Sequence, residues 1–162
     1  MKLYIFVLVV CIVVSLPGCS KPSTTKIKTP TQVSYNLYTQ YSYGGPRAQS
    51  DTTFYYCTNS RTIFDSLFFF IYDHNNNPDT IPSVDFLTKK VISIVKYGND
   101  FHVLSVKEVS LLDGILDVEY SDSLVVENMT WIAAIPLIMI TNVDFQKIRF
   151  IENGKQLKEI NP

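Results

Sequence analysis

Two dipeptides most strongly constrain the fold of this chain: Asp113-Gly114 and Asn153-Gly154, each of which separates two apolar segments. Both residues of such a pair readily adopt a positive φ, which the tight turn between two antiparallel strands requires. The sequence therefore predicts two β-hairpins, one joining residues 101–112 to 115–120 and the other joining residues 145–152 to 155–160.

Further segments have the pattern of strands. Residues 33–43 alternate between apolar and polar side chains and predict one half-buried strand. Its expected inward face is formed by Val33, Tyr35, Leu37, Tyr41 and Tyr43. Residues 53–57 predict a short strand. The apolar segments 91–97 and 131–140 predict buried strands, and Pro136 in the second segment requires a bulge or an edge position because proline cannot donate a ladder hydrogen bond.

One segment has helical spacing. Apolar side chains recur from Ile63 to Ile71 at intervals of three and four residues, and either Asn59 or Ser60 can cap the first turn. We expect one short helix of about ten residues near residues 60–71. The chain contains ten Tyr, ten Phe and many Val and Ile, and this composition favours β-sheet outside the helical segment. The predicted fold is mainly β, with seven or eight strands arranged as a β-sandwich, an Ig-like sheet or an open barrel.

The first 19 residues have the composition of a signal peptide. Lys2 precedes an unbroken apolar run, Leu3 to Val14, which is shorter than the ~20 residues that a membrane span needs. The segment ending in Gly18-Cys19 resembles the bacterial lipobox, in which the cysteine becomes the first residue of the mature chain and carries lipid. This resemblance implies a protein of the bacterial cell envelope, anchored in the lipid bilayer through Cys19 on the periplasmic or the surface face. An ordinary secreted protein and an uncleaved anchor are the alternatives.

The chain divides into three parts. Residues 1–18 are the predicted signal peptide, residues 19–31 a flexible tether rich in Ser, Thr, Lys and Pro, and residues 32–162 a single β-rich domain. The formal net charge of −1 gives no electrostatic reason to expect a nucleic-acid partner. Of the three cysteines, Cys11 is removed with the signal peptide and Cys19 is lipidated. Cys57 is then left without a partner for a disulfide.

No pattern of residues predicts an enzyme, and none predicts a cofactor. The chain has no Gly-x-Ser-x-Gly, P-loop or zinc-type spacing, and Cys57 is best interpreted as a small buried hydrophobe. The nearest approach to a metal site is a set of oxygen side chains at alternate positions, which suit Ca²⁺. These are Asp73, Asn75, Asn77 and Asp79. An EF-hand loop would need glycine in place of Pro78, and the same residue types are typical of a plain solvated loop.

The order of segments in the second half carries a family resemblance. Val84-Asp85-Phe86 precedes the strand that ends at Tyr97-Gly98, and Trp131 to Pro136 precedes Ile148-Arg149-Phe150. Over residues 60–152 this order resembles the C-terminal domain of PrcB, a lipoprotein subunit of a bacterial surface protease complex. The resemblance implies contact with a protease through the turn Tyr97, Gly98, Asn99, Asp100 and Phe101, where Asn99-Asp100-Phe101 replaces the Thr-Gly-Gly-Tyr-like turn usual in the family.

Two functions remain open at this stage. The first is a non-enzymatic envelope lipoprotein that binds another protein, with a protease or protease complex as the candidate partner. Turns on a rigid sheet commonly carry such contacts. The alternative is a lipoprotein that binds a small ligand or a glycan, because exposed tyrosine rings can stack on sugar faces. Its candidate residues are Tyr35, Tyr38, Tyr41 and Tyr43.

Overall fold

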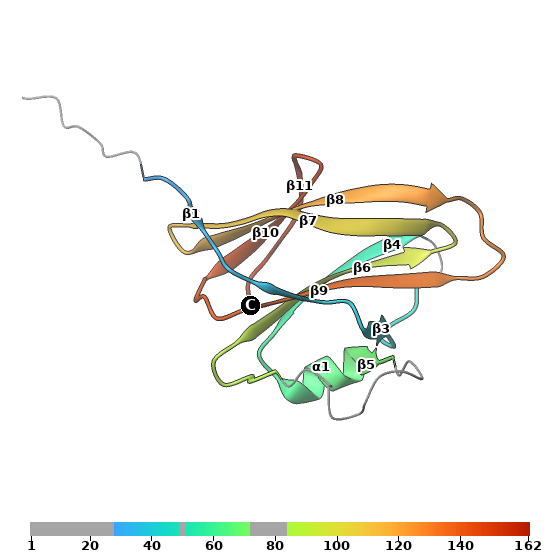
Figure 1. Ribbon diagram of the computed structural model, residues 1–162, viewed down its shortest axis with the longest axis horizontal. Helices are drawn as coiled ribbons and strands as arrows, with labels where there is room; N and C mark the ends of the chain where they lie inside the picture. The colour runs from blue at the N-terminus through green and yellow to red at the C-terminus, as the bar shows by residue number, and fades with distance from the viewer. Residues whose placement is uncertain (1–27, 49–50, 72–83) are drawn as a thin grey trace, which may run out of the picture.

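The computed structural model describes residues 28–48, 51–71 and 84–162, which form three layers (Figure 1). The first layer is a five-stranded sheet, in the order β1 (Thr31–Gln32), β7 (Phe101–Leu112), β8 (Ile115–Val126), β10 (Lys147–Glu152) and β11 (Lys155–Ile160). The second is a four-stranded sheet, in the order β2 (Asn36–Tyr38), β9 (Ala133–Thr141), β6 (Lys90–Gly98) and β4 (Thr52–Thr58). The third contains β3 (Tyr41–Tyr43), α1 (Arg61–Leu67) and β5 (Phe68–Phe70). The predicted mainly β fold with one short helix is confirmed.

Both predicted hairpins are present. Asp113 and Gly114 have φ of 51° and 77°, and Asn153 and Gly154 have φ of 49° and 82°, as the expected turn type requires. The turns join β7 to β8 and β10 to β11 in antiparallel pairs. In contrast, β10 pairs with β8 in parallel, because the chain leaves the first sheet, forms β9 in the second sheet and then returns.

The main core lies between the two large sheets. Leu116, Val118 and Tyr120 on β8 are fully buried, as their alternation predicts. They meet Ile92 and Ile94, which lie on the facing side of β6. This interior supplies most of the apolar burial that stabilises the domain.

A second core lies between the four-stranded sheet and the third layer. Val91 and Val95 project from the other face of β6 and pack with Phe64, Leu67 and Phe68 of the helical layer. The sheet is therefore covered on both faces. This arrangement explains why residues 91–97 are apolar throughout rather than alternating.

The prediction of one strand over residues 33–43 is wrong. This segment forms β2 and β3, which pair in two different sheets, and it follows β1, which pairs in the third. The Val33 N–H still donates to the Val109 carbonyl at 2.9 Å, but the chain then crosses from the first sheet to the second. Because the chain changes sheets, alternation does not define one common face, and Leu37 is 46% exposed.

The predicted helix is shorter than expected. Ser60 caps it, since its Oγ accepts the Ile63 N–H at 3.4 Å, but α1 ends at Leu67. Phe68 to Phe70 form β5, which pairs with β3, and their burial alternates as in a strand. Phenylalanine favours strands, and here a strand partner is available. The extra strands β1 and β5 and the division of residues 33–43 into β2 and β3 explain why the described residues hold eleven strands rather than seven or eight.

Pro136 occupies an edge position. β9 pairs with β6 along its whole length without a register shift, whereas β2 covers only Ile138 to Ile140. The missing N–H therefore interrupts no ladder. Within the part of the chain that the structure describes, no helix is long and apolar enough to cross a membrane.

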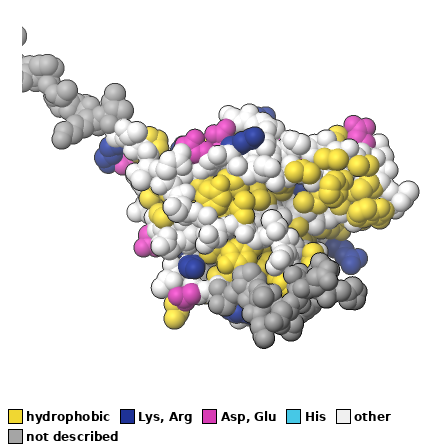
Figure 2. Space-filling view, viewed as in Figure 1, with side chains coloured by type: hydrophobic (Ala, Val, Ile, Leu, Met, Phe, Trp, Pro, Cys, Tyr) yellow, Lys and Arg dark blue, Asp and Glu magenta, His cyan; other side chains and the backbone are white. Residues whose placement is uncertain are grey.

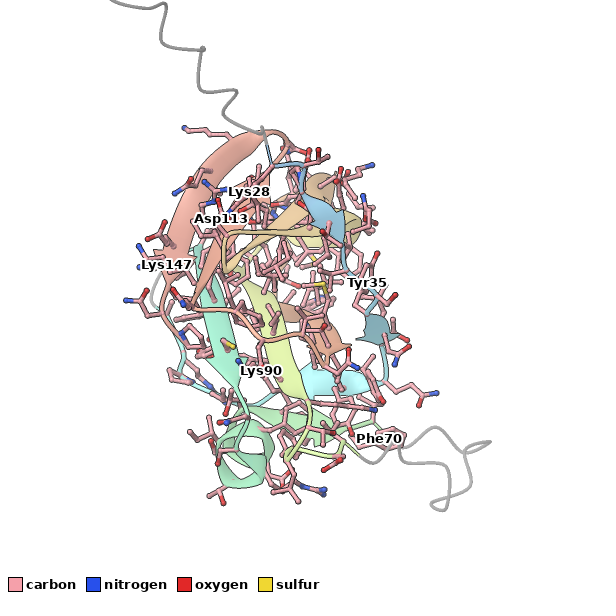
Figure 3. The ribbon with its side chains drawn as sticks, turned by 90° about the vertical axis from the view of Figure 1, so that its left-hand side faces the viewer. Lys28, Tyr35, Phe70, Lys90, Asp113 and Lys147 are labelled. Carbon is pink, nitrogen blue, oxygen red and sulfur yellow. The ribbon has the colours of Figure 1, made fainter. Side chains whose placement is uncertain are left out.

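The described end of the predicted tether lies against the domain. Thr31 belongs to β1, and Lys28 Nζ lies 2.5 Å from Asp113 Oδ1 at the β7–β8 turn (Figure 3). The predicted signal peptide and Cys19 lie outside the described residues. The chain thus reaches the domain beside the turn at Asp113.

Candidate functional site

The two ends of the sandwich differ in their connections. β7 runs from Phe101, next to the β6–β7 turn, to Leu112, and β1 pairs with it only near Leu112. At about 3.3 Å per residue, these ends are roughly 35 Å apart. The N-terminal segment and the β6–β7 turn lie on opposite sides of the molecule in Figure 1. We call the end formed by residues 98–101 and 127–132 the distal end.

Hydrogen bonds fix the β6–β7 turn at the distal end. The Asn99 N–H donates to Asp51 Oδ1 at 3.0 Å, and the Asp100 carboxylate accepts the Asn128 N–H at 2.8 Å. The Met129 N–H donates to the Asn99 carbonyl at 2.7 Å. Because three chain segments are bonded together here, the turn presents a fixed surface.

The five predicted contact residues divide into two groups. Tyr97 is buried in the second core, and a Cβ on Gly98 would lie 1.7 Å from Asp51 Oδ1, so glycine is needed for this close approach. Asn99 is exposed, and Asp100 and Phe101 are half-buried. A partner can therefore reach the last three residues, whereas the first two serve the fold.

An apolar patch adjoins this turn. Five large apolar side chains of the last part of β8 and of the β8–β9 segment are each 47% to 60% exposed. We call them the distal apolar patch: Leu124, Val125, Val126, Trp131 and Ile132. Figure 2 shows hydrophobic side chains gathered at this end of the molecule. The sequence pattern suggested a buried strand from Trp131 onward, but β9 begins only at Ala133.

A groove of about 530 Å³ lies next to the distal apolar patch. Its walls include Trp131 and Ile132 from the patch and Phe101 from the turn. Tyr43 on β3 and Arg47, which follows β3 in the chain, also line it. Among the residues that the structure describes, Arg47 is the one charged residue that lines it. The groove joins the predicted turn and the patch into one continuous surface.

Below this surface, charged side chains meet between the sheets. Lys96 Nζ on β6 lies 2.5 Å from Asp122 Oδ2 and 3.8 Å from Glu152 Oε2. His102 Nδ1 lies 2.6 Å from the other oxygen of Asp122, whose side chain is only 6% exposed. We call these four residues the inter-sheet cluster. Because water hardly reaches Asp122, the cluster links the two sheets firmly. Removing one of its members should therefore lower the stability of the domain substantially.

Two tyrosines extend the inter-sheet cluster. The Tyr120 hydroxyl donates to Glu152 Oε2 at 2.8 Å and lies 3.0 Å from the Tyr55 hydroxyl. Burial is the main cause that raises the pKa of both phenols, so both stay neutral at physiological pH. Sequence reasoning missed this cluster because its members come from separate strands and share no local spacing.

Cys57 lies on β4 and packs against the main core. Burial raises the pKa of its thiol to about 11, although Lys90 opposes this shift. The thiol is therefore protonated at neutral pH, and a protonated thiol is a poor nucleophile. The structure agrees with its interpretation as a small buried hydrophobe.

The pKa of Cys57 gives a testable pH dependence. The unfolded chain loses this proton near pH 9 and the folded chain only near pH 11, so stability falls as pH rises through this window. Between about pH 8 and pH 10, wild type is expected to lose ~1 kcal/mol more stability than Cys57→Ala, measured by urea unfolding. Equal slopes for the two proteins would show that the thiol is not held protonated.

The tyrosine stripe is not an exposed surface. Tyr41 and Tyr43 are buried, and Tyr35 and Tyr38 are half-buried against the two cores. Two of the four rings are thus enclosed and the other two lie against different cores, so the four tyrosines do not form the exposed stripe on which the glycan-binding alternative rests. Among the described residues, no group of three or more His, Cys, Asp or Glu could hold a metal ion. Asp73, Asn75, Asn77 and Asp79 lie outside those residues.

The distal end thus combines a fixed turn, an apolar patch and an adjoining groove above the inter-sheet cluster. Such a surface is already shaped before a partner arrives, so little ordering is needed on contact. No protein-family model, no curated protein and no solved structure matches this chain, so the role of the distal end is inferred from its own residues.

Proposed function

We propose that this chain is a non-enzymatic lipoprotein of the bacterial cell envelope that binds another protein through its distal end. The distal apolar patch is the observation that carries this proposal. Apolar side chains exposed in a contiguous group beside polar residues mark interaction surfaces, whereas scattered ones have no such meaning. Here five such side chains come from one stretch of chain between Leu124 and Ile132.

The residue types and the rigidity of this surface suit protein binding. Trp131, 60% exposed, is the single tryptophan of the chain, and tryptophan is strongly enriched among residues that dominate binding energy. Full burial of one large apolar side chain contributes about 1.5–3 kcal/mol. The hydrogen bonds that hold residues 99, 100, 128 and 129 together reduce the entropy lost on binding.

The direction of the anchor supports the same function. The chain reaches the domain beside Asp113, about 35 Å from the distal end. A lipid on Cys19 would hold the end near Asp113 toward the bilayer, and the distal end would face away from it. The resemblance to the PrcB family makes a protease or a protease complex the candidate partner, and the turn it implicates, Tyr97 to Phe101, borders the patch.

Cross-linking in the intact envelope tests this proposal. Ile132→Asp introduces a charge into the patch, and Ile63→Asp introduces the same charge at a similarly exposed position on α1. We expect cross-linked partner to fall about tenfold or more with Ile132→Asp and to be unchanged with Ile63→Asp. The full-length protein is also labelled with radioactive palmitate, which should mark wild type but not Cys19→Ala.

Two results would contradict the proposal. Equal partner recovery by both aspartate variants would exclude the distal apolar patch as the binding surface. Palmitate label of equal strength on wild type and Cys19→Ala, or absent from both, would exclude the anchor at Cys19.

A further inference from the structure

Two sheet edges on one side of the sandwich are only partly covered. β8 pairs with β7 along its whole length, but on the other side of β7 the strand β1 pairs only with Ser110 and Leu111. In the second sheet, β2 likewise covers only Ile138 to Ile140 of β9. The chain from β1 to β2 therefore closes the half of this side near the tether and leaves the distal half uncovered among the described residues (Figure 1).

The direction of the free backbone groups on β7 follows from the pairing of β8. The Tyr120 carbonyl accepts an N–H from the β10–β11 turn at 2.9 Å, so its backbone faces away from β7. Strand alternation then directs Ser121 toward β7, where its register partner is Ser105. Leu104 and Val106, which flank Ser105, consequently direct their N–H and C=O groups away from β8, to the uncovered side.

This part of β7 lacks the side chains that usually protect a sheet edge. Exposed edges commonly carry proline, charged side chains or bulges that prevent a further strand from pairing. Residues 101–106 contain no proline, Lys, Arg, Asp or Glu, and the part from His102 to Val106 lies between the two register shifts of the β7–β8 pair, at Phe101/His102 and at Val106/Glu108. In contrast, β11 at the other edge of the same sheet carries Lys155, Lys158 and Glu159, and Pro136 protects β9. We call residues 101–106 the open edge.

We infer that the open edge of β7 takes up an extended segment of the partner protein as an additional strand. The inference rests on the proposed function and specifies how the partner is held. Only another peptide backbone supplies donors and acceptors with the repeat of the free groups at Leu104 and Val106. The open edge begins at Phe101, which also lines the groove beside the distal apolar patch.

The neighbouring side chains define the chemistry of this segment. Val103 is 46% exposed on the outer face of the sheet, and Leu104 is half-buried toward the main core. Side chains of an added strand alternate between these two environments. The partner segment is therefore extended and of low charge, with β-branched or aromatic residues at alternate positions.

A peptide selection with full-length protein in detergent tests this inference. The probe is a phage-displayed library of linear peptides of about ten residues, the upper length of an ordinary strand. Selected peptides should show the alternating apolar pattern and should slow hydrogen exchange at the Leu104 and Val106 amides. Val103→Lys should weaken their binding about tenfold or more. Leu157→Lys, which places the same charge at an equally exposed position on β11, should leave binding unchanged.

Several outcomes would overturn the inference. The inference is wrong if the selection yields no binders, or if the binders leave the Leu104 and Val106 amides unprotected. It is also wrong if the peptides bind both lysine variants with equal affinity. Protection of these amides that grows with protein concentration alone would assign the open edge to a second copy of this chain. If Ile132→Asp abolishes partner cross-linking in the envelope while Val103→Lys preserves it, strand addition is excluded and the proposed function stands.

Discussion

Replacing Asp122 by alanine is expected to lower the free energy of unfolding by about 3–5 kcal/mol. The change leaves Lys96 and His102 without the carboxylate that both contact, in a place where the Asp122 side chain was only 6% exposed. Lys96 Nζ then keeps only Glu152 Oε2, at 3.8 Å, and its charge is only partly solvated because the Lys96 side chain is 22% exposed. Urea unfolding of wild type and variant measures the loss.

Asp117→Ala is the matched control for this prediction. Asp117 lies on the same strand but faces outward, where its carboxylate pairs with Arg149 at 2.5 and 2.6 Å and is 25% exposed. Because water reaches both side chains and can solvate the Arg149 charge that is left behind, this variant should lower the free energy of unfolding less than Asp122→Ala does. If both variants lose the same stability, the inter-sheet cluster is not the enclosed link that its geometry indicates.

The second large effect is expected in the main core, where Phe150→Ala should cost about 3–5 kcal/mol. Phe150 is fully buried on β10, and its ring centroid lies 4.7 Å from that of Tyr55 on the facing sheet. Truncation leaves a cavity between two sheets that are held apart by their other side chains. Because packed interiors relax only partly, the lost contacts are not recovered.

Phe69→Ala removes the same ring from a different environment. Phe69 lies on β5 and is 55% exposed, so we expect the free energy of unfolding to fall by no more than about 1 kcal/mol. Thermal unfolding and urea unfolding should both show Phe69→Ala to be more stable than Phe150→Ala. A large loss for Phe69→Ala, or a small one for Phe150→Ala, would contradict the description of the main core.

These two predictions bear on the distal end as well as on stability. Lys96 precedes the β6–β7 turn, and Asp122 precedes the apolar side chains of β8 by two residues. The inter-sheet cluster therefore holds the strands that carry the turn, the patch and the open edge. A surface formed by an uncovered side of a sandwich needs such internal links, since no further strand stabilises it.

The second half of the fold could be predicted from the sequence because its signals are local. Asp113-Gly114 and Asn153-Gly154 specify turns between adjacent segments, and the alternation through Leu116 and Val118 specifies which face is buried. Turn chemistry and period-two patterning act over a few residues, so they do not depend on the rest of the chain. The bounds predicted for β7 and β11 are those of the structure.

The candidate site could be predicted only in part. The turn at residues 98–101 was identified, but the roles of Tyr97 and Gly98 in the fold depend on Phe54 and Asp51, which are distant in the sequence. The exposed position of Trp131 was missed because an apolar run does not reveal where a strand begins. The single tryptophan, at the start of that run, is the one sequence signal that indicates a possible contact residue there.

The sequence by itself determined the strand-rich character of this protein, its two hairpins and the apolar faces of its longest strands. The tertiary structure alone decided which sheet each strand joins: residues 31–43 divide among three sheets as β1, β2 and β3, β10 lies parallel to β8, and Lys96 meets Asp122 and Glu152. The physical reason is that alternation and turn residues encode short-range geometry. The choice of strand partner depends instead on packing between segments far apart in the chain, and that same packing leaves residues 101–106 of β7 without a second neighbouring strand among the described residues.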